Sequence, residues 1–236
     1  MAGGLARFGR EEFVQERWAM DPGDHVTFCG PTRRGKTQLT FDLLERSATP
    51  ELPAIFFGMK PRDDVVDVRT KELGFKKVTR WPPPLTAKVQ KPRGYLLRPP
   101  TVFDPYKDDV VHHRTFRSAM LDSYKRGNRI VVPDELYGVA DLGLSREMIA
   151  LWSRGGAMGC GMWGGVQKPS HVPAWAFNNA SHVFLWHDPD LRNVKRFAEF
   201  GGIDTKLLAE TVTNLDFYEA LYLRRRGGAA CIVNSQ

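Results

Sequence analysis

The chain has 236 residues, of which 42% are hydrophobic, and its formal net charge is +7. This length and composition are typical of one α/β domain with a sizeable core. No apolar run reaches the length of a membrane span, and charged residues stand where a secretory signal would need an apolar segment, so we expect a cytosolic protein. The three cysteines, Cys29, Cys160 and Cys231, lack metal-ligand spacing, and we expect them to be buried free thiols.

The first predicted elements are a short amphipathic helix from Phe13 to Met20 and a buried strand from Val26 to Cys29. The segment GPTRRGKT, Gly30 to Thr37, follows this strand and fits the phosphate-loop pattern G-x-x-x-x-G-K-[ST]. Apolar residues at positions 39, 41, 43 and 44 then predict a helix. The motif therefore stands in the order of strand, loop and helix that phosphate binding requires.

The spacing of this motif suits a loop that wraps a triphosphate with backbone N–H groups, which glycines such as Gly30 and Gly35 allow to approach closely. Lys36 would place its charge at the β- and γ-phosphates, Thr37 would offer its hydroxyl to Mg²⁺, and the helix N-terminus would add its dipole. We expect ATP and Mg²⁺ as ligands, although the motif does not distinguish ATP from GTP. The alternative is a glycine-rich turn without a ligand. The expected nucleotide-binding residues are Gly30, Pro31, Thr32, Arg33, Arg34, Gly35, Lys36, Thr37 and Gln38.

For Arg33 and Arg34 we expect only the backbone N–H groups to contribute, because side chains at these loop positions generally point away from the phosphates. The motif divides the chain into a lead-in segment over 1–23 and a single ATPase domain over 24–236. A second strand is predicted from Ala54 to Phe57. A Pro-rich basic stretch from Arg80 to Pro100 follows, with one short strand from Tyr95 to Leu97.

A helix is predicted from Asp108 to Lys125, and the β-branched run after it, from Arg129 to Pro133, resembles a Walker B strand ending in Asp134 and Glu135. Carboxyl ends of strands in an open α/β sheet meet the ligand, so Asp134 would hold Mg²⁺ together with Thr37. Glu135 would polarise the water that attacks the γ-phosphate. The alternative is an ordinary solvated loop. Pro133 removes a ladder N–H and predicts that the strand ends early.

The remaining elements are predicted from apolar periodicity and turn signals. They are a helix from Ser145 to Arg154, strands from Met158 to Val166 and His182 to Trp186, helices from Asp190 to Phe200 and Asp204 to Thr211, and a terminal hairpin of Phe217 to Leu223 and Ala229 to Val233.

The basic residues gather in three patches, which favours a polyanionic partner. No sequence-reading motif accompanies them, so we expect contacts to the backbone of a nucleic acid. Each patch taken alone is more often a solvated face. The patches are Lys76, Lys77 and Arg80; Lys88, Lys91 and Arg93 around Tyr95; and Arg224, Arg225 and Arg226.

The strand that ends in Gln167, followed by Lys-Pro-Ser170, resembles the strand ending in T-Q-R-P-S of the FtsK/HerA superfamily of DNA-pumping ATPases. With the phosphate loop and the Asp-Glu pair in the same order, the resemblance covers residues from Asp24 to about Val233. Val166 stands where the family has threonine, and the Gly58-Met-Lys60-Pro segment lacks the aspartate of the family's D-P-K segment.

This resemblance implies an α/β fold of the P-loop NTPase class, RecA/ASCE-like, with a mainly parallel central sheet flanked by helices and a C-terminal β-hairpin. It also implies that Gln167 senses the γ-phosphate or the attacking water; the alternative is a buried structural amide. Arg154 lies near the family's arginine finger, which acts on the neighbouring subunit. Arg146 competes for this role, and the alternative for both is an ordinary surface arginine.

A finger that acts in trans implies a homo-oligomeric ring, expected to be a hexamer, around double-stranded DNA. Because the ATPase core accounts for nearly the whole chain, the resemblance is greatest to viral genome-packaging ATPases, which would work in the host cytoplasm, docked on a capsid vertex or a membrane protein. Two alternatives remain open. One is a motor of conjugation or filamentous-phage assembly with a membrane partner. The other is a nucleotide switch or kinase with Arg62 to Arg80 as its lid, although the Asp-Glu pair favours water as acceptor.

Overall fold

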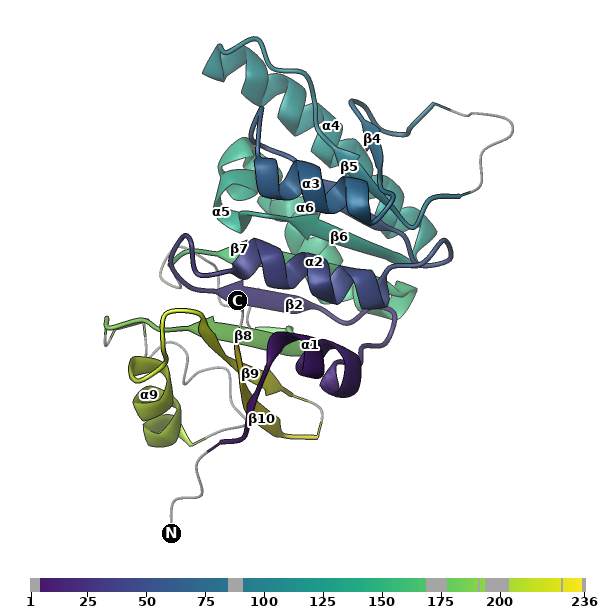
Figure 1. Ribbon diagram of the computed structural model, residues 1–236. Helices are drawn as coiled ribbons and strands as arrows, with labels where there is room; N and C mark the ends of the chain where they lie inside the picture. Colours follow the sequence, from purple (N-terminus) through teal and green to yellow (C-terminus); the bar gives the residue numbers. More distant parts are fainter. Residues whose placement is uncertain are drawn as a thin grey trace. The chain divides into compact units, whose positions relative to one another are not determined.

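The computed structural model describes residues 5–84, 91–168, 178–190, 192–193, 204–225 and 227–234 (Figure 1). The chain forms two compact units. Unit 1 comprises Met1–Ala19, His25–Arg46 and Gly165–Gln236, and unit 2 comprises Met20–Asp24 and Ser47–Gly164. Both contain a sheet with helices packed against it, so the predicted α/β class is confirmed.

The sheet of unit 1 has the strand order β1-β10-β9-β8-β2. The phosphate-loop strand β2 pairs in parallel with β8, whereas β8, β9 and β10 pair antiparallel, which confirms the predicted C-terminal hairpin. The elements of this unit are β1 (Arg7–Phe8), α1 (Arg10–Glu12), η1 (Phe13–Arg17), β2 (Val26–Cys29), α2 (Lys36–Ser47), β8 (His182–Trp186), α9 (Thr205–Thr213), β9 (Glu219–Arg224) and β10 (Ala229–Asn234).

The lead-in segment packs onto this sheet through aromatic side chains. The ring of Phe13 is fully buried and lies 4.8 Å from that of Tyr222, and the ring of Trp18 lies 4.7 Å from that of His182, measured between centroids. The expected helix from Phe13 to Met20 instead begins at Arg10 and ends at Arg17, because Trp18 adopts an extended conformation with ψ of 121°. Phe13 and Trp18 therefore belong to the core of unit 1.

The sheet of unit 2 has the order β7-β6-β3-β5-β4, and all its strands are parallel. Parallel strands are joined by crossover connections, which here are helical. The elements are β3 (Ala54–Phe57), α3 (Asp64–Glu72), β4 (Lys76–Val78), β5 (Gly94–Leu97), α4 (Pro105–Arg126), β6 (Arg129–Pro133), α5 (Leu136–Val139), η2 (Ala140–Leu144), α6 (Ser145–Ala150), η3 (Leu151–Gly155), η4 (Gly156–Met158) and β7 (Cys160–Val166), whose last two residues belong to unit 1.

Helices cover both faces of this sheet: in Figure 1, α3 lies in front of the strands, and α4 and α6 lie behind them. Right-handed crossovers produce this distribution, because the chain passes from β3 to β4 in one direction and returns through β5 and β6 in the other. The long helix α4 begins with Asp104, whose side chain accepts a hydrogen bond from Lys107 N, and stops at Gly127, where φ is +68°. The ring of Phe116 in α4 stacks on the ring of Phe57 in β3.

Two differences from the sequence predictions concern unit 2. Strand β6 continues through Pro133, which pairs with Phe57 of β3. The prediction that the proline ends the strand early is therefore wrong for the pairing with β3. On the other side, pairing with β7 stops at Val131. The segment from Arg62 to Arg80, considered as a lid, contains α3 and β4, and β4 is paired with β5 as a strand of this sheet.

The three cysteines are buried free thiols, as predicted. Burial raises the pKa of Cys160 to about 12, so this thiol stays protonated at neutral pH. Within the part of the chain that the structure describes, no helix is both long and apolar enough to span a membrane. Most of the helix predicted from Asp190 to Phe200 lies outside the described residues.

The stacked pair of Phe57 and Phe116, with ring centroids 4.5 Å apart, provides a test of the core of unit 2. Phe116 is fully buried, so Phe116→Ala is expected to lower the free energy of unfolding by about 3–5 kcal/mol in urea titrations. The control Phe103→Ala removes the same ring from a site that is 80% exposed and should change it by less than about 0.5 kcal/mol. Equal effects of the two substitutions would contradict the packing.

Candidate nucleotide-binding site

The phosphate-loop segment lies between a buried strand and the N-terminus of a twelve-residue helix. The strand, the loop and all of the helix except its last residue belong to unit 1. Every residue of β2 is buried, and the loop leaves the sheet at Gly30, whose N–H donates to Val166 O at 2.9 Å. Helix α2 begins at Lys36, and its first turn is closed by Leu39 N donating to Gly35 O. The helix dipole and the amides of its first turn therefore lie at the loop.

Two glycines shape this loop for different reasons. A Cβ on Gly30 would lie 2.5 Å from Cβ of the buried Trp186, so the chain can pass here only without a side chain. Gly35 has φ of +86°, a left-handed conformation that glycine adopts at little cost. Arg33 also has a positive φ, 59°, which is uncommon for a residue with a side chain. The backbone is thus bent at the points where a phosphate-binding loop must curve.

The side chain of Lys36 is directed back along its own loop. Its Nζ donates to Gly30 O and to Pro31 O, both at 2.6 Å. The positive charge is therefore held at the loop by carbonyl oxygens, which phosphate oxygens could replace as acceptors. The neighbouring Thr37 and Gln38 are the next residues of α2 and are partly buried.

The side chain of Arg34 is directed to another part of unit 1. Its Nη1 donates to Phe217 O at 3.2 Å, and its Cζ lies 3.8 Å from the centroid of the Phe217 ring. This cation–π contact ties the loop to the segment before β9. The side chains of Pro31, Thr32 and Arg33 are partly or fully exposed.

Asp134 and Glu135 lie in unit 2 at the carboxyl end of β6, and both are partly buried. Glu135 occupies the N-cap position of α5 in an extended conformation, yet its side chain makes no capping hydrogen bond. The carboxylate of Glu135 is thus not used to start the helix. The two acids line a small cavity together with Gly58, Lys60, Asp63 and Arg98 from the ends of β3 and β5.

Two basic residues of this cavity were not among the predicted site residues. The hydrogen bond from Lys60 Nζ to Asp63 Oδ2, 3.0 Å long, raises the pKa of Lys60, and the nearby charges of Asp134 and Glu135 act in the same direction. Arg98 follows β5 directly and is only 6% exposed. The sequence held one signal for Arg98, because a charged residue stands immediately after the apolar run of β5. The residue that pairs with Arg98 lies on helix α3, which was not predicted from the sequence.

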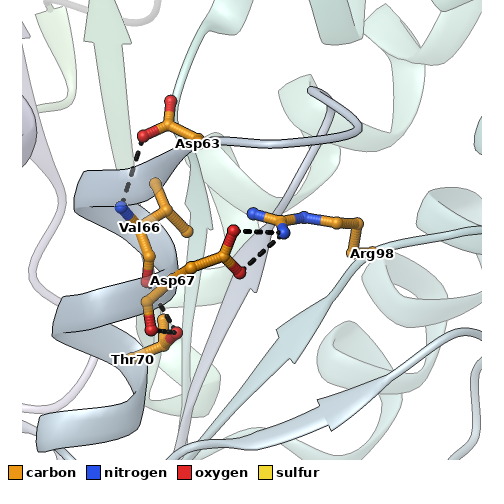
Figure 2. A network of polar contacts seen from close by, with 5 residues as sticks. All are labelled: Asp63, Val66, Asp67, Thr70 and Arg98. Atoms are coloured by element: carbon orange, nitrogen blue, oxygen red, sulfur yellow. Dashed lines mark hydrogen bonds and ion pairs between the residues drawn. The ribbon is translucent and has the colours of Figure 1, made fainter.

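That partner is Asp67 of α3, and Figure 2 shows its carboxylate facing the guanidinium of Arg98. Nη1 of Arg98 donates to both carboxylate oxygens, at 2.7 and 2.8 Å. This hydrogen bonding to Arg98 holds the pKa of Asp67 below its usual range. The helix that carries Asp67 is itself started by Asp63, whose side chain accepts a hydrogen bond from Val66 N.

The remaining predicted residues lie at the surface. Gln167 follows β7 directly and is exposed, so the alternative of a buried structural amide is wrong. Arg154 in η3 is exposed, with its Cζ 5.6 Å from the ring centroid of Tyr124, and Arg146 in α6 is exposed as well. The Lys-Pro-Ser segment after Gln167 lies outside the described residues beyond Lys168.

Oxygen atoms of side chains are the protein donors that Mg²⁺ prefers. Among the described residues, no group of three or more His, Cys, Asp or Glu side chains is arranged to hold a metal. Mg²⁺ commonly takes only one or two protein ligands and completes its shell with water and substrate phosphates. A hydroxyl such as that of Thr37 and a carboxylate such as that of Asp134 therefore fit an ion that arrives with a nucleotide.

No protein-family model matches the chain, and no curated protein matches its sequence. Solved structures do resemble it. The genome-packaging NTPase B204 of Sulfolobus turreted icosahedral virus 2, in complex with AMPPCP, superposes with a TM-score of 0.61 at 14% identity, covering 90% of this chain and 98% of B204. EssC (ATPases 2 and 3) of Geobacillus thermodenitrificans gives a TM-score of 0.56 at 12% identity, covering 90% of this chain and 40% of that chain.

The type VII secretion ATPase EccC of Thermomonospora curvata gives a TM-score of 0.54 at 11% identity, covering 93% of this chain and 26% of that chain. At such low identities the similarity establishes the fold. The resemblance to viral genome-packaging ATPases that the motifs indicated is therefore confirmed at the level of the fold, which this chain shares with B204 and EssC.

The pair of Asp67 and Arg98 predicts how stability responds to pH. Because the folded-state pKa of Asp67 is lowered, its contribution is present above the ordinary value of 3.8 and is lost as the pH falls through the folded-state pKa. Asp67→Asn should lower the free energy of unfolding by about 1–3 kcal/mol at pH 7, the cost of leaving a buried donor poorly paired. In thermal unfolding, the difference from the wild type should shrink in acid. The exposed Asp64→Asn on the same helix should have little effect, and a pH-independent gap for Asp67→Asn would contradict the pairing.

Proposed function

We propose that this protein is an ATPase that moves double-stranded DNA, of the kind that packages viral genomes. The observation that carries the proposal is the superposition with the packaging NTPase B204, which covers 90% of this chain and 98% of that chain. Little of either chain therefore lies outside the fold that the two proteins share. B204 was solved with AMPPCP and with ATP-gammaS, which supports a nucleoside triphosphate as substrate here.

In this proposal the loop from Gly30 to Thr37 binds the triphosphate through its backbone N–H groups, as the bends at Gly30 and Gly35 support. Lys36 exchanges its two carbonyl acceptors for oxygens of the β- and γ-phosphates. Gln38 and the first turn of α2 contribute further amides and the helix dipole. These interactions orient the substrate and neutralise its charge.

We propose Thr37 and Asp134 as the ligands of Mg²⁺, which supplies charge neutralisation at the phosphates when bound. Glu135 would accept a hydrogen bond from the attacking water, and Gln167 would contact that water or the γ-phosphate. The position of Gln167 directly after β7, at an exposed site, supports this role.

The proposed partner is the DNA backbone. The residues of the basic patches differ in how exposed they are and in whether they have partners within the chain. Arg93 donates to Ala48 O and Arg225 to Asn178 O, so each of these residues has an intramolecular role. Lys77 and Arg80, at the strand β4 that ends the sheet of unit 2, are exposed. Contacts of lysine and arginine to phosphates release counterions, which makes such binding independent of sequence and strongly dependent on salt.

The first test is steady-state ATP hydrolysis without nucleic acid and with duplex DNA, single-stranded DNA or RNA. Duplex DNA should raise turnover several-fold, and the stimulation should fall steeply as salt rises. Lys36→Ala should abolish turnover, whereas Glu135→Gln should bind nucleotide but not hydrolyse it. The exposed Lys71→Ala serves as the control for loss of a lysine. Unchanged turnover in Lys36→Ala would refute the site, and indifference to every polymer would refute the DNA motor.

Arg154 is proposed to act on the active site of a neighbouring copy, in a ring that we propose to be hexameric. Arg154→Ala should lower turnover about 10³-fold or more, the effect of losing an arginine finger. Mixing it with Lys36→Ala, which still donates Arg154, should restore part of the activity. The neighbouring exposed Arg146→Ala is the matched control. If a mixture of Arg154→Ala and Lys36→Ala regains no activity, action in trans is contradicted. If only the mixture of Arg146→Ala and Lys36→Ala regains activity, the finger is Arg146.

A further inference from the structure

Two neighbouring aromatic side chains of unit 1 are exposed in the turn before β9. Phe217 is 51% and Tyr218 is 36% exposed, whereas Leu215 before them and Ala220 after them are buried. The two rings are arranged edge to face, with centroids 4.8 Å apart and an angle of 70° between their planes. We call Phe217 and Tyr218 together the aromatic platform.

Strand register places the aromatic platform at the same end of the sheet as the phosphate loop. Ala220 of β9 is opposite Trp186 of β8, and Leu185 of β8 is opposite Cys29, the last residue of β2. Because β9 runs antiparallel to β8, and β8 runs parallel to β2, the first residues of β9 lie where the other two strands end. The aromatic platform and the loop that follows β2 therefore leave the sheet at the same end of these strands.

A side chain of the phosphate loop contacts the aromatic platform directly. Arg34 donates from Nη1 to Phe217 O at 3.2 Å, and its Cζ lies 3.8 Å from the centroid of the Phe217 ring. The turn is closed by two hydrogen bonds of 3.1 Å, from Glu219 N to Asp216 O and from Asp216 N to Glu219 Oε2. These contacts hold the aromatic platform beside the loop.

The contacts within the chain explain where these rings lie but not why they are exposed. Aromatic side chains that remain in water forgo the free energy that their burial would gain. The cation–π contact with Arg34 uses part of the Phe217 ring, and about half of the residue's surface remains accessible. Exposed aromatic surface beside a proposed ligand site is therefore available for contact with that ligand.

The ligand that we propose for the loop carries a group of matching chemistry. A nucleoside triphosphate held by its phosphates also brings its base to the surroundings of the loop, because phosphates, ribose and base are joined covalently. The base is a flat aromatic ring system, which stacks well on aromatic side chains. Phosphates and Mg²⁺ instead require polar or charged partners, so the base is the part of the ligand that fits two apolar rings.

We propose that the aromatic platform stacks against the base of the bound nucleotide, with Arg34 as the residue that positions Phe217. This inference rests on the proposed function of the loop as the site for a nucleoside triphosphate. Stacking gains more from two fused rings than from one, so the platform selects purine over pyrimidine nucleotides. It does not distinguish adenine from guanine, since both present the same fused ring system.

The test compares ligands with and without a base by isothermal titration calorimetry in the presence of Mg²⁺. Phe217→Ala should weaken the binding of ATP about tenfold, the scale of losing one stacking partner. It should leave the binding of inorganic tripolyphosphate unchanged, because this ligand has no base. The wild type should bind ATP and GTP more tightly than CTP. The matched control Phe103→Ala removes an exposed ring of unit 2 and should change the affinity for neither ATP nor tripolyphosphate.

Further variants separate stacking from general apolar packing. Phe217→Trp keeps an aromatic face and should retain the affinity for ATP, whereas Phe217→Leu lacks that face and should bind ATP as weakly as Phe217→Ala. Both keep a large apolar side chain, so their comparison still decides the matter if Phe217→Ala does not fold. Tyr218→Ala should weaken the binding of ATP but not that of tripolyphosphate.

The proposal is overturned if Phe217→Ala binds ATP as tightly as the wild type does. It is also overturned if this variant loses affinity for ATP and tripolyphosphate equally, since the ring would then act on the loop alone. Equal affinities of Phe217→Leu and Phe217→Trp for ATP would exclude stacking, and equal affinities of the wild type for ATP and CTP would exclude selection of purines.

Failure of the proposed nucleotide site would look different. The wild type would then bind neither ATP nor tripolyphosphate, which would refute the phosphate loop and the aromatic platform together. If the wild type binds both ligands, the loop is supported, and the variants at Phe217 decide on the platform alone. No arm contains DNA, so the result is independent of whether the protein moves DNA.

Discussion

The parallel pairing of β3 with β5 and β6 is the constraint on which the acidic half of the site depends. Phe57 of β3 is opposite both Leu97 and Pro133, so the three strands end at one level of the sheet. The residues that follow, Gly58, Arg98 and Asp134, are thereby brought to a common cavity although they are far apart in the sequence. Charged groups can gather there because the carboxyl ends of parallel strands lie outside the two buried faces of the sheet.

Unit 1 uses the same principle with different chemistry. A glycine also follows its strand β2 directly, but the loop there presents backbone amides and the charge of Lys36 in place of carboxylates. The bulk of Trp186 fixes the path of the chain at Gly30. Unit 1 therefore carries the amides and the lysine that we propose for phosphate binding, and unit 2 carries the two carboxylates that we propose for hydrolysis.

Local signals predicted the elements that carry strong periodicity or clear end signals. The strand from Val26 to Cys29 was predicted with its observed bounds, and α4 is longer than predicted only because Asp104 caps it and Gly127 ends it. Helix α3 was missed because its sequence is mostly polar, and its buried residues are only Val66 and Thr70. No apolar stripe marks such a helix, so pattern reading cannot find it.

The sequence by itself determined the order of strand, loop and helix around Lys36, the acidic end of β6 and the class of the fold, since each depends on residues close together in the chain. Only the tertiary structure decided that Arg98 pairs with Asp67, 31 residues away, and that Arg98 and Glu135 line the same cavity. Such neighbours are created by strand register and by the side of the sheet on which a helix packs. Both are selected by burial of the whole core, which no local pattern of residues records.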